Sequence, residues 1–313
     1  MGPSEGPPAL RNCPVCGARG GGPVGEKPGV RLVRCGACGL VHIPDVGPEF
    51  RTGEHYVDAG QAYYLTPDKL GADYHPVRYE RELRLFRRFC PRGRVLDVGC
   101  GTGGFLHQLS QRFPGEYEVH GHDVSTPALE HARSMGVHVY PGDFLQLDLP
   151  EGGSQAVTLW AVLEHLPEPG AFVTRAARLV APGGHVFLLV PNWNSLARRL
   201  LGLRYRYVLP EHLNYFTAAT LRRLTARTPE LEPVFARTTH FNPLVILQDW
   251  RRGGSPVPAG ERGALLQRTN RWKTRRGLAP VRLLYRIAES ALAVLSLADN
   301  LVLVLRRRGG AGE

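Results

Sequence analysis

Residues 94–104 read RVLDVGCGTGG, and this stretch decides the fold that the sequence predicts. Its first half, from Arg94 to Val98, is a short apolar run typical of a buried strand. Glycines then occupy every second position from Gly99 to Gly103, and we expect a helix to follow. Such glycines let the backbone turn tightly and approach a ligand at the carboxyl end of a strand. The loop alone is a weak signal, because a dinucleotide held at the helix N-terminus would use a similar one.

Strands and helices alternate on both sides of this loop. The expected strands are 94–98, 117–123, 137–140, 156–160, 185–190, 231–241 and 300–305. The expected helices are one within 74–89, then 103–113, 126–134, 170–180, 217–227 with Thr217 as its N-cap, and 281–298. Alternating βα units predict the α/β class, with a doubly wound, mostly parallel sheet covered by helices on both faces.

Acidic residues stand at the ends of the first three expected strands. Asp97 lies two residues before the first glycine of the loop. Asp123 ends the next strand, where a carboxylate can accept hydrogen bonds from both hydroxyls of a ribose. Asp143 and Phe144 follow the third strand and offer an acid and an aromatic ring to an adenine. Together these positions predict a nucleoside-containing cofactor.

The order of these motifs resembles that of the class I S-adenosylmethionine-dependent methyltransferases. The motifs are Val95–Gly103, His122–Ser125, Gly142–Phe144, Leu163–Leu166 and Leu179–Gly184. The resemblance covers residues 74–241 and the last strand, and it implies a Rossmann-like, seven-stranded sheet with an antiparallel final strand. An NAD enzyme is the weaker alternative, since its G-x-G-x-x-G pattern places the third glycine one residue later, where Gly104 does permit it.

The resemblance also implies roles for individual residues. Gly99, Gly101 and Gly103 would form the loop beneath the methionine part of S-adenosylmethionine, and Asp97 would hold its amino-acid end. Asp123 would take the ribose hydroxyls, and Asp143 and Phe144 the adenine. Trp160 and Ala161 would offer backbone groups to the methionine amine. For each acid, the alternative is an ordinary solvated or capping carboxylate.

Two histidines are candidates for a general base, which an oxygen acceptor needs. His165 follows the fourth core strand, and its unperturbed pKa lies near neutrality. His212 stands in a segment, 210–217, that resembles the lid of many small-molecule methyltransferases. A packing role is the alternative for both. The pair Glu164-His165 resembles the ubiquinone-type O-methyltransferases, but Ala161 stands where that group has a further acid, which argues against metal-assisted catechol chemistry.

Two other classes of methyltransferase are excluded by residues that are missing. No Asn/Asp-Pro-Pro-Tyr follows the fourth strand, so the chain lacks the cradle for an exocyclic base amine. No Pro-Cys pair occurs there either, so attack on cytosine C5 by a cysteine is not expected.

Four of the six cysteines form one pattern, C-x2-C-x18-C-x2-C, made by Cys13, Cys16, Cys35 and Cys38. Two such knuckles give the tetrahedral, four-sulfur site that structural zinc prefers. Four unliganded thiols or two disulfides are the alternatives, and a reducing compartment disfavours the disulfides. With all four positions filled by protein, the predicted Zn²⁺ is structural and not catalytic.

The predicted organisation has five parts. They are a zinc ribbon at 10–45, a linker and helix at 46–90, a methyltransferase core at 91–241 with a lid at 192–216, a basic helical insertion at 242–299, and the last core strand at 300–308. The helix at 281–298 is apolar on most faces, which predicts burial against the sheet or a partner. The basic run Arg268–Arg276, with Trp272, predicts contact with RNA or an anionic membrane surface, or forms a solvated face.

The charge is uneven along the chain. Of 39 basic and 28 acidic residues, the segment 191–313 carries 21 basic but only 8 acidic ones. The net charge of +11 therefore belongs to the lid, the insertion and the tail, and not to the cofactor-binding core. No secretory signal or membrane-spanning helix is recognised, and a cytoplasmic location is expected.

The sequence therefore predicts an S-adenosylmethionine-dependent methyltransferase that acts on a small molecule or a saccharide, by O-methylation or by C-methylation. An RNA methyltransferase, whose ribbon and basic insertion bind RNA, is one alternative. A non-catalytic zinc-ribbon scaffold is the other. Whether the chain forms a homodimer through its C-terminal helix is left open.

Overall fold

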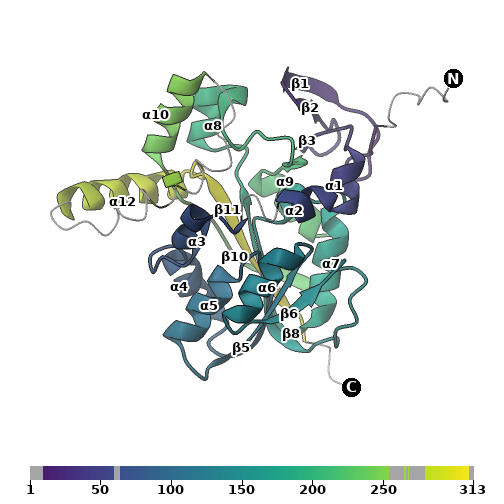
Figure 1. The fold of residues 1–313 in the computed structure, drawn as a ribbon. Helices are drawn as coiled ribbons and strands as arrows, with labels where there is room; N and C mark the ends of the chain where they lie inside the picture. Colours follow the sequence, from purple (N-terminus) through teal and green to yellow (C-terminus); the bar gives the residue numbers. More distant parts are fainter. Residues whose placement is uncertain (1–9, 60–63, 254–263, 266, 268–278, 310–313) are drawn as a thin grey trace.

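A seven-stranded sheet forms the centre of the molecule (Figure 1). The computed structural model describes residues 10–59, 64–253, 264, 265, 267 and 279–309. The strand order is β10-β11-β8-β7-β4-β5-β6. The bounds are β4 Gly93–Val98, β5 Tyr117–Asp123, β6 His138–Pro141, β7 Ser154–Trp160, β8 Val180–Pro191, β10 Leu231–Thr239 and β11 Asn300–Arg307. The strands from β8 to β6 are parallel, whereas β11 runs antiparallel to both of its neighbours.

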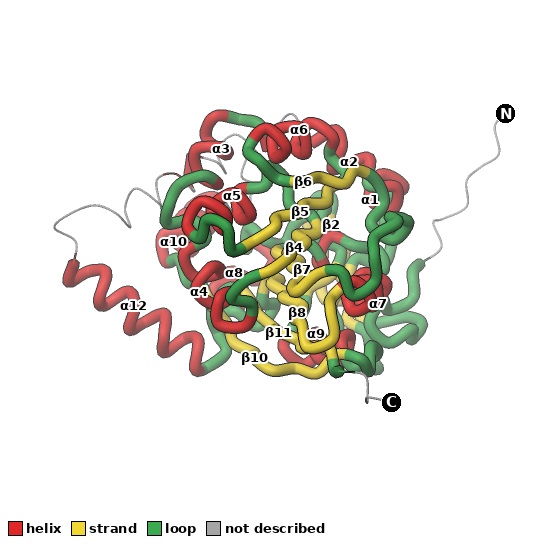
Figure 2. Tube along the Cα trace, turned by 90° about the horizontal axis from the view of Figure 1, so that it is seen from below, coloured by secondary structure: helices red, strands yellow, loops and turns green. Residues whose placement is uncertain are grey.

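Helices cover both faces of this sheet, which confirms the doubly wound α/β prediction. The helices α4 Glu80–Phe89, α5 Gly104–Arg112 and α6 Thr126–Ser134 pack on one face, and α7 Pro169–Leu179 and α9 Ala218–Thr225 on the other (Figure 2). The chain order reverses between β4 and its neighbours β5 and β7. In such sheets ligands bind beyond the carboxyl ends of the strands at this reversal.

Two element boundaries differ from the sequence prediction. The helix expected within 74–89 begins only at Glu80, as α4, and a separate helix, α3 Pro67–Asp73, lies in the segment expected to be a linker, with Pro76 between the two. The residue before a proline is disfavoured in helical conformation, which explains the break at His75. Residues 181–184 were expected to form a break between α7 and a strand beginning at 185. Instead they lie within β8, which begins at Val180, where it pairs with Ser154.

A second, smaller sheet joins the N-terminal segment to the lid. Its strands are β1 Gly22–Lys27, β2 Val30–Arg34, β3 Val41–His42 and β9 Asn214–Tyr215, in that order. The last of these belongs to the lid, and β3 pairs with it antiparallel. We call the N-terminal segment, residues 10–45, the ribbon. The lid therefore supplies the fourth strand of the ribbon's sheet.

Ribbon and lid also share one hydrophobic core. Its buried members come mainly from these two segments: Val30, Leu32, Val41, Ile43, Val46, Trp193, Ala197, Leu201, Tyr205, Val208, Leu213 and Tyr215. The lid itself contains α8 Leu196–Leu201 and the 3-10 turn η3 Gly202–Arg204. The short helices α1 Pro48–Thr52 and α2 Glu54–Ala59 follow the ribbon and lead towards the main sheet (Figure 1).

The C-terminal insertion contributes two described helices, α10 Pro243–Arg252 and α12 Ala279–Val294. The first is tied to the lid, since Arg206 Nε donates to Asp249 Oδ1 at 2.9 Å. The second projects from the body (Figures 1 and 2), and Leu283 and Ile287 are about 60% exposed. These two side chains are not buried against the sheet, which was one of the two expectations, and burial against a partner stays a prediction. The basic run Arg268–Arg276 lies outside the described residues. In the part of the chain that is described, no helix is long and apolar enough to cross a membrane.

Candidate active site

The glycine loop lies between β4 and α5, where the sequence predicts the cofactor. Gly99, Gly101 and Gly103 have φ angles of 73°, 53° and 77°, in the left-handed region that favours glycine. A Cβ on Gly99 would stand 2.7 Å from Cγ2 of Val162, which follows β7. The loop therefore needs glycine both for its backbone angles and for its close approach to the end of β7.

Asp123, at the end of β5, holds this loop in place. Its Oδ2 accepts a hydrogen bond from Gly101 N at 2.8 Å, and its Oδ1 accepts one from Ser125 N at 2.9 Å. Burial raises the pKa of Asp123, against the lowering effect of these backbone donors. Each carboxylate oxygen retains a lone pair, so the group can also accept bonds from ligand hydroxyls.

Asp97 is more deeply buried, at 3% exposure, inside the end of β4. Its carboxylate is bonded to Thr158, whose Oγ1 donates to Oδ1 at 2.6 Å. Burial and the nearby charge of Asp123 raise the pKa of Asp97 to about 7, although the Thr158 hydrogen bond opposes them. A buried carboxylate with one neutral donor suits an ammonium group. The two acids thus fit the amine and the ribose of S-adenosylmethionine.

The pKa of Asp97 leads to a testable pH dependence. Only the ionised carboxylate attracts an ammonium, so cofactor affinity is expected to rise about tenfold between pH 5.5 and pH 7, where the cofactor amine stays protonated. Calorimetric titration with S-adenosylmethionine measures this. Asp97→Asn is expected to bind more weakly and with no such slope, and a wild-type affinity independent of pH would contradict the role given to Asp97.

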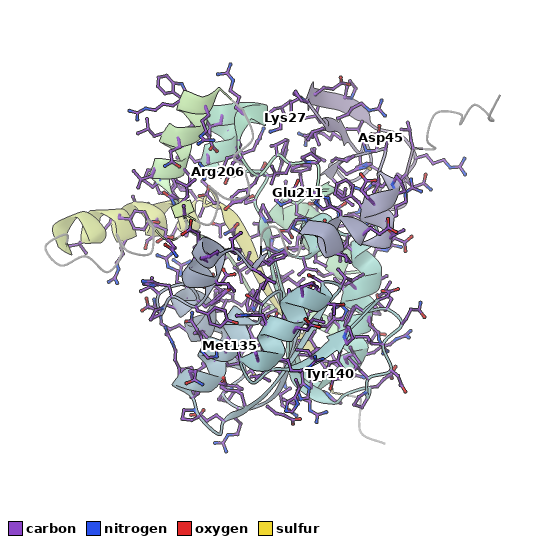
Figure 3. The ribbon with its side chains drawn as sticks, in the orientation of Figure 1. Lys27, Asp45, Met135, Tyr140, Arg206 and Glu211 are labelled. Carbon is purple, nitrogen blue, oxygen red and sulfur yellow. The ribbon has the colours of Figure 1, made fainter. Side chains whose placement is uncertain are left out.

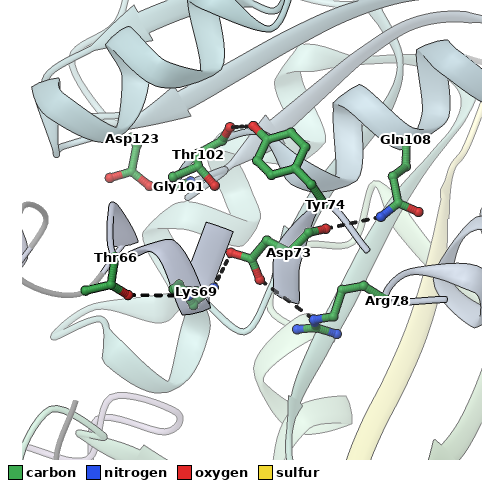
Figure 4. A network of polar contacts seen from close by, with 9 residues as sticks. All are labelled: Thr66, Lys69, Asp73, Tyr74, Arg78, Gly101, Thr102, Gln108 and Asp123. Atoms are coloured by element: carbon green, nitrogen blue, oxygen red, sulfur yellow. Dashed lines mark hydrogen bonds and ion pairs between the residues drawn. The ribbon is translucent and has the colours of Figure 1, made fainter. Parts of the chain in front are cut away.

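A segment before the core covers the glycine loop from the outside (Figure 4). Tyr74, just after α3, donates its hydroxyl to the carbonyl oxygen of Thr102 inside the loop. The preceding Asp73 is buried and forms an ion pair with Lys69, and its carbonyl oxygen accepts from Gln108 Nε2 at 3.1 Å. The sequence prediction missed this cover, because its only signal was a polar stretch with scattered aromatic residues.

The residues predicted for the adenine occupy different environments. Asp143 is exposed, and its Oδ1 accepts from Leu145 N at 3.0 Å. Phe144 is buried, with its ring 5.2 Å from that of Phe172 and 5.5 Å from that of His122. Phe144 is thus packed within the core behind the loop 142–144, and its contact with an adenine stays a prediction.

The end of β7 is strained, as functional positions often are. Ala161 has a φ of 58°, although it carries a Cβ, and its N donates to Leu189 O at 2.8 Å. The indole Nε1 of the neighbouring Trp160 is buried with no hydrogen-bond partner in the described residues. The strand therefore ends in a turn that presents the backbone of residues 160–162 beside the glycine loop.

Beyond this turn, the two candidate bases His165 and His212 lie next to each other and next to Glu164, which was not predicted as a site residue. The 3-10 turn η2 Leu163–His165 carries Glu164 and His165, and the lid brings His212 to them. One ligand atom from each residue lies within 4.8 Å of those of the others. The rings of His165 and His212 meet edge to face, with centroids 4.7 Å apart. We call these three residues the Glu-His-His cluster.

Glu164 is the unusual member of this cluster. It is 1% exposed, and in the described part of the chain neither of its carboxylate oxygens has a hydrogen-bond partner. Its Oε1 lies 4.0 Å from Nε2 of His165. Burial raises the pKa of Glu164 to about 8. The sequence motif indicated His165 as a candidate base. The burial of the neighbouring Glu164 depends on the tertiary structure, so the motif did not indicate it.

Hydrogen bonds determine which nitrogen of each histidine carries the proton. Nδ1 of His165 lies 2.9 Å from Glu211 O, and Nδ1 of His212 lies 2.8 Å from Tyr207 O. A carbonyl oxygen can only accept, so each Nδ1 donates and each Nε2 carries the lone pair. The hydroxyl of Tyr56 lies 3.1 Å from the same Nδ1 and donates to Glu211 O at 3.3 Å. Burial lowers the pKa of His165 to about 4, so this ring is neutral at pH 7.

The four predicted zinc ligands come together at the base of the ribbon. The sulfurs of Cys13, Cys16, Cys35 and Cys38 all lie within 4.8 Å of one another, with Cys13–Cys38 at 3.4 Å and Cys16–Cys35 at 3.5 Å. All six cysteines are free thiols, so the alternative of two disulfides is not realised. Sulfurs around one zinc with bonds of about 2.3 Å would lie roughly 3.8 Å apart. The cluster therefore has the donor set and nearly the spacing of a four-cysteine zinc site.

Contacts from the ribbon reach the two segments that carry the histidines. The Arg11 guanidinium donates to Ile43 O in the ribbon at 2.8 Å, to Leu213 O in the lid at 2.6 Å and to Pro167 O after η2 at 3.1 Å. In Figure 3, Glu211 of the lid lies on the same side of the molecule as Lys27 and Asp45 of the ribbon. The ribbon is thus attached directly beside His212.

Known proteins resemble the middle of this chain. The family model described as "Methyltransferase domain" matches residues 75–228. The ubiquinone biosynthesis O-methyltransferase of Ralstonia nicotianae is 36% identical over 165 residues, which span 48% of this chain and 68% of that protein. The protein of the same name from Vibrio atlanticus is 33% identical over 168 residues, with shares of 48% and 68%. These matches cover about half of the chain described above.

A likeness in fold extends further along the chain. A crystal structure of a SAM-dependent methyltransferase from Thermotoga maritima superimposes with a TM-score of 0.51 and 17% identity. It covers 82% of this chain and 97% of its own. At this identity the likeness concerns the fold alone.

Proposed function

Because this chain belongs to the class I S-adenosylmethionine-dependent methyltransferases, we propose that it transfers the methyl group of S-adenosylmethionine to an oxygen of a small hydroxylated molecule. The observation that carries this proposal is the Glu-His-His cluster at the end of β7 beneath the lid, in which Glu164 and His212 are buried and His165 is half-buried. An oxygen acceptor must lose a proton, and a neutral imidazole lone pair in a water-poor site can take it. The two relatives reported above, which are named O-methyltransferases, support oxygen as the acceptor atom.

In this mechanism the residues of the core mainly align the two reactants. S-Adenosylmethionine supplies an electrophilic methyl group for an in-line displacement. Asp97 would hold the ammonium of the cofactor, Asp123 the ribose hydroxyls, and the backbone at Ala161 the methionine end. Correct alignment of two bound reactants can supply about 7–11 kcal/mol of the barrier, so these binding residues contribute to the rate as well as to affinity.

The proton of the acceptor hydroxyl would pass to Nε2 of His165. The hydrogen bond from Nδ1 to Glu211 O directs that lone pair towards Glu164 and His212. The lid closes this side of the site, and His212 is the second candidate base.

A cavity of small-molecule size is lined in part by Trp160, but by none of the three residues of the Glu-His-His cluster. It has a volume of about 390 Å³ and lies between α4, β10 and α12. Phe235 and Val302 give it apolar walls, and Arg81, Arg237 and Arg286 line its polar side. This volume falls within the range of about 300–1,000 Å³ that is usual for small-molecule sites. Because the cluster does not line this cavity, the proposal for the acceptor rests on the cluster and on the relatives, and not on the cavity.

The ribbon has a structural part in this proposal. A Zn²⁺ ion held by Cys13, Cys16, Cys35 and Cys38 would fix the two knuckles, which pack against α9 and the core. The fixed ribbon would in turn hold the lid through the pairing of β3 with β9 and through Arg11. We therefore assign the zinc a role in shaping the acceptor site and none in the chemistry.

The acceptor class can be tested with S-adenosylmethionine labelled in its methyl group. We expect label to enter hydroxylated small molecules, such as a panel of phenols, catechols and sugars, with the methyl on oxygen by mass spectrometry. Bulk RNA serves as the competing substrate. Label found in RNA and in none of the small molecules would replace this proposal by the RNA alternative.

The role of His165 predicts a specific kinetic pattern. His165→Gln keeps a polar side chain but removes the basic nitrogen, so methyl transfer to the acceptor from the panel is expected to fall at least about 100-fold. The affinity for S-adenosylmethionine should stay within about threefold of wild type. His138→Gln, an exposed histidine on β6, is the matched control. Unchanged turnover in His165→Gln would remove His165 from the mechanism.

A further inference from the structure

The cavity between α4, β10 and α12 has no part in the proposed function, because none of the three cluster residues lines it. Two of its walls are regular. On β10, Phe235 and Arg237 stand two residues apart and so point to the same face of the strand. On α12, Arg286 and Ala293 stand seven residues apart and so share one face of the helix. The cavity therefore lies between a strand face and a helix face.

Positive charge exceeds negative charge on the lining of this cavity. Besides His240, its charged side chains are four arginines and two glutamates: Arg81, Arg84, Arg237, Arg286, Glu82 and Glu289. Both glutamates are already paired within the protein. Glu289 binds the guanidinium of Arg81 through both carboxylate oxygens, and Oε1 of Glu82 lies 3.2 Å from Nε2 of His240. These acids therefore do not neutralise the remaining arginines.

Two of those arginines are left without a counter-charge. Arg84 lies 3.7 Å from Glu80, whereas in the described part of the chain neither Arg237 nor Arg286 forms an ion pair or a side-chain hydrogen bond. A guanidinium group presents a planar fork of donors that matches the two oxygens of a carboxylate or a phosphate. One of these forks comes from β10 and the other from α12, so the cavity offers an oxoanion a donor group on each side.

The rest of the lining suits the body of an organic ligand. Phe235 and Val302 supply apolar surface, and Trp160 adds an indole whose buried Nε1 has no hydrogen-bond partner among the described residues. Oε2 of Glu82 is buried and unpartnered in the same way. Such groups are costly to bury, and a polar substituent on a ligand compensates them. His240 also has a φ of 63°, and backbone strain of this kind recurs where proteins hold ligands.

We propose that this cavity binds a small organic oxoanion, a carboxylate or a phosphate ester with an apolar body, through the guanidinium groups of Arg237 and Arg286. The site is separate from the Glu-His-His cluster, so the inference goes beyond the proposed function. The bound anion would also connect two elements that few described polar contacts join, among them the hydrogen bond from Thr238 Oγ1 to Ala293 O at 3.1 Å. It would thereby fix α12, which projects from the body (Figure 1).

Benzoate and phenyl phosphate are suitable probes, because each joins an oxoanion to an aromatic ring. Benzamide has nearly the shape of benzoate but no charge. Titration of the full-length protein, followed by the NMR signals of the probe, is expected to show saturable binding of at least one anion. The stronger of the two identifies the carboxylate or the phosphate as the preferred group. Benzamide should bind at least about tenfold more weakly than the anions, because it lacks the charge-assisted hydrogen bonds.

Variants locate the bound anion. The double variant Arg237→Gln, Arg286→Gln should weaken binding at least about tenfold, and it should fold, because both side chains are exposed; thermal melting checks this. Arg222→Gln, at an exposed arginine of α9 on the other face of the sheet, is the matched control and should bind as wild type does. His165→Gln should also bind as wild type does, since His165 does not line the cavity. Amide exchange in residues 285–294 should slow when the anion is bound.

Four results would overturn the proposal. They are the absence of saturable binding of either anion, equal binding of benzamide and the anions, an equal loss of binding in Arg222→Gln, and an equal loss in His165→Gln, which would place the anion at the cluster. Each of these measurements is made without S-adenosylmethionine and without methyl transfer, so the methyltransferase proposal would survive all four.

Discussion

Cys35→Ser is expected to abolish zinc binding and to lower methyl transfer at least about 100-fold while leaving S-adenosylmethionine affinity within about threefold of wild type. The physical reason is the coupling of two parts of the fold. Structural zinc contributes roughly 10–16 kcal/mol of apparent binding free energy to small domains, so the knuckles should not stay ordered without it. Because β3 pairs with β9 and the ribbon shares its core with the lid, the disorder should spread to the segment 207–216.

Hydrogen exchange gives a measurement that does not depend on the acceptor. In Cys35→Ser, amide exchange in residues 207–216 should accelerate, while exchange in the glycine loop at 99–104 should not change. Cys90→Ser is the matched control, since Cys90 is a buried cysteine far from the cluster in sequence and lies in the core beneath α4. A lid that exchanges at the wild-type rate after loss of zinc would contradict the role given to the ribbon.

The central sheet and the cofactor loop were predictable from the sequence because their signals are local. Short apolar runs alternate with helical patterns from β4 to β8, and the glycine positions follow directly from the first strand. Asp123 was predictable for the same reason, since a residue at the end of a parallel strand lies at the ligand-binding edge. The capping box at Thr217, which starts α9, is also a local signal.

The contact between ribbon and lid was not predictable, because it is carried by two strands of two residues each. Val41–His42 and Asn214–Tyr215 lie more than 170 positions apart and show no alternating pattern. Glu164 was missed for a related reason. Its burial and lack of partners arise only when the lid is folded over η2, although the residue stands next to a predicted one.

The helix α12 shows the opposite case. Its apolar pattern correctly predicted a helix, but an apolar pattern does not say whether a face is covered. Leu283 and Ile287 are exposed, whereas Glu289 on the same helix is buried and forms an ion pair with Arg81 of α4. Polar contacts thus attach this helix to the rest of the fold, since Tyr285 also donates to Phe241 O and Thr238 Oγ1 to Ala293 O.

Asp123→Ala should remove the affinity for S-adenosylmethionine more completely than any other single change. The carboxylate would accept the ribose hydroxyls, and hydrogen bonds to a charged group are worth about 1.5–3 kcal/mol each. The same carboxylate holds Gly101 N and Ser125 N, so its loss also loosens the glycine loop. Together these effects predict a loss of at least about 100-fold in affinity. Asp148→Ala is the control, because Asp148 is an exposed acid outside the motifs.

Calorimetric titration of these three proteins with S-adenosylmethionine therefore tests the proposed cofactor site. We expect one bound cofactor per chain in wild type and in Asp148→Ala, and no measurable binding in an Asp123→Ala protein that melts cooperatively. Binding of wild-type strength in Asp123→Ala, or no binding in wild type, would contradict the cofactor site on which the whole mechanism depends.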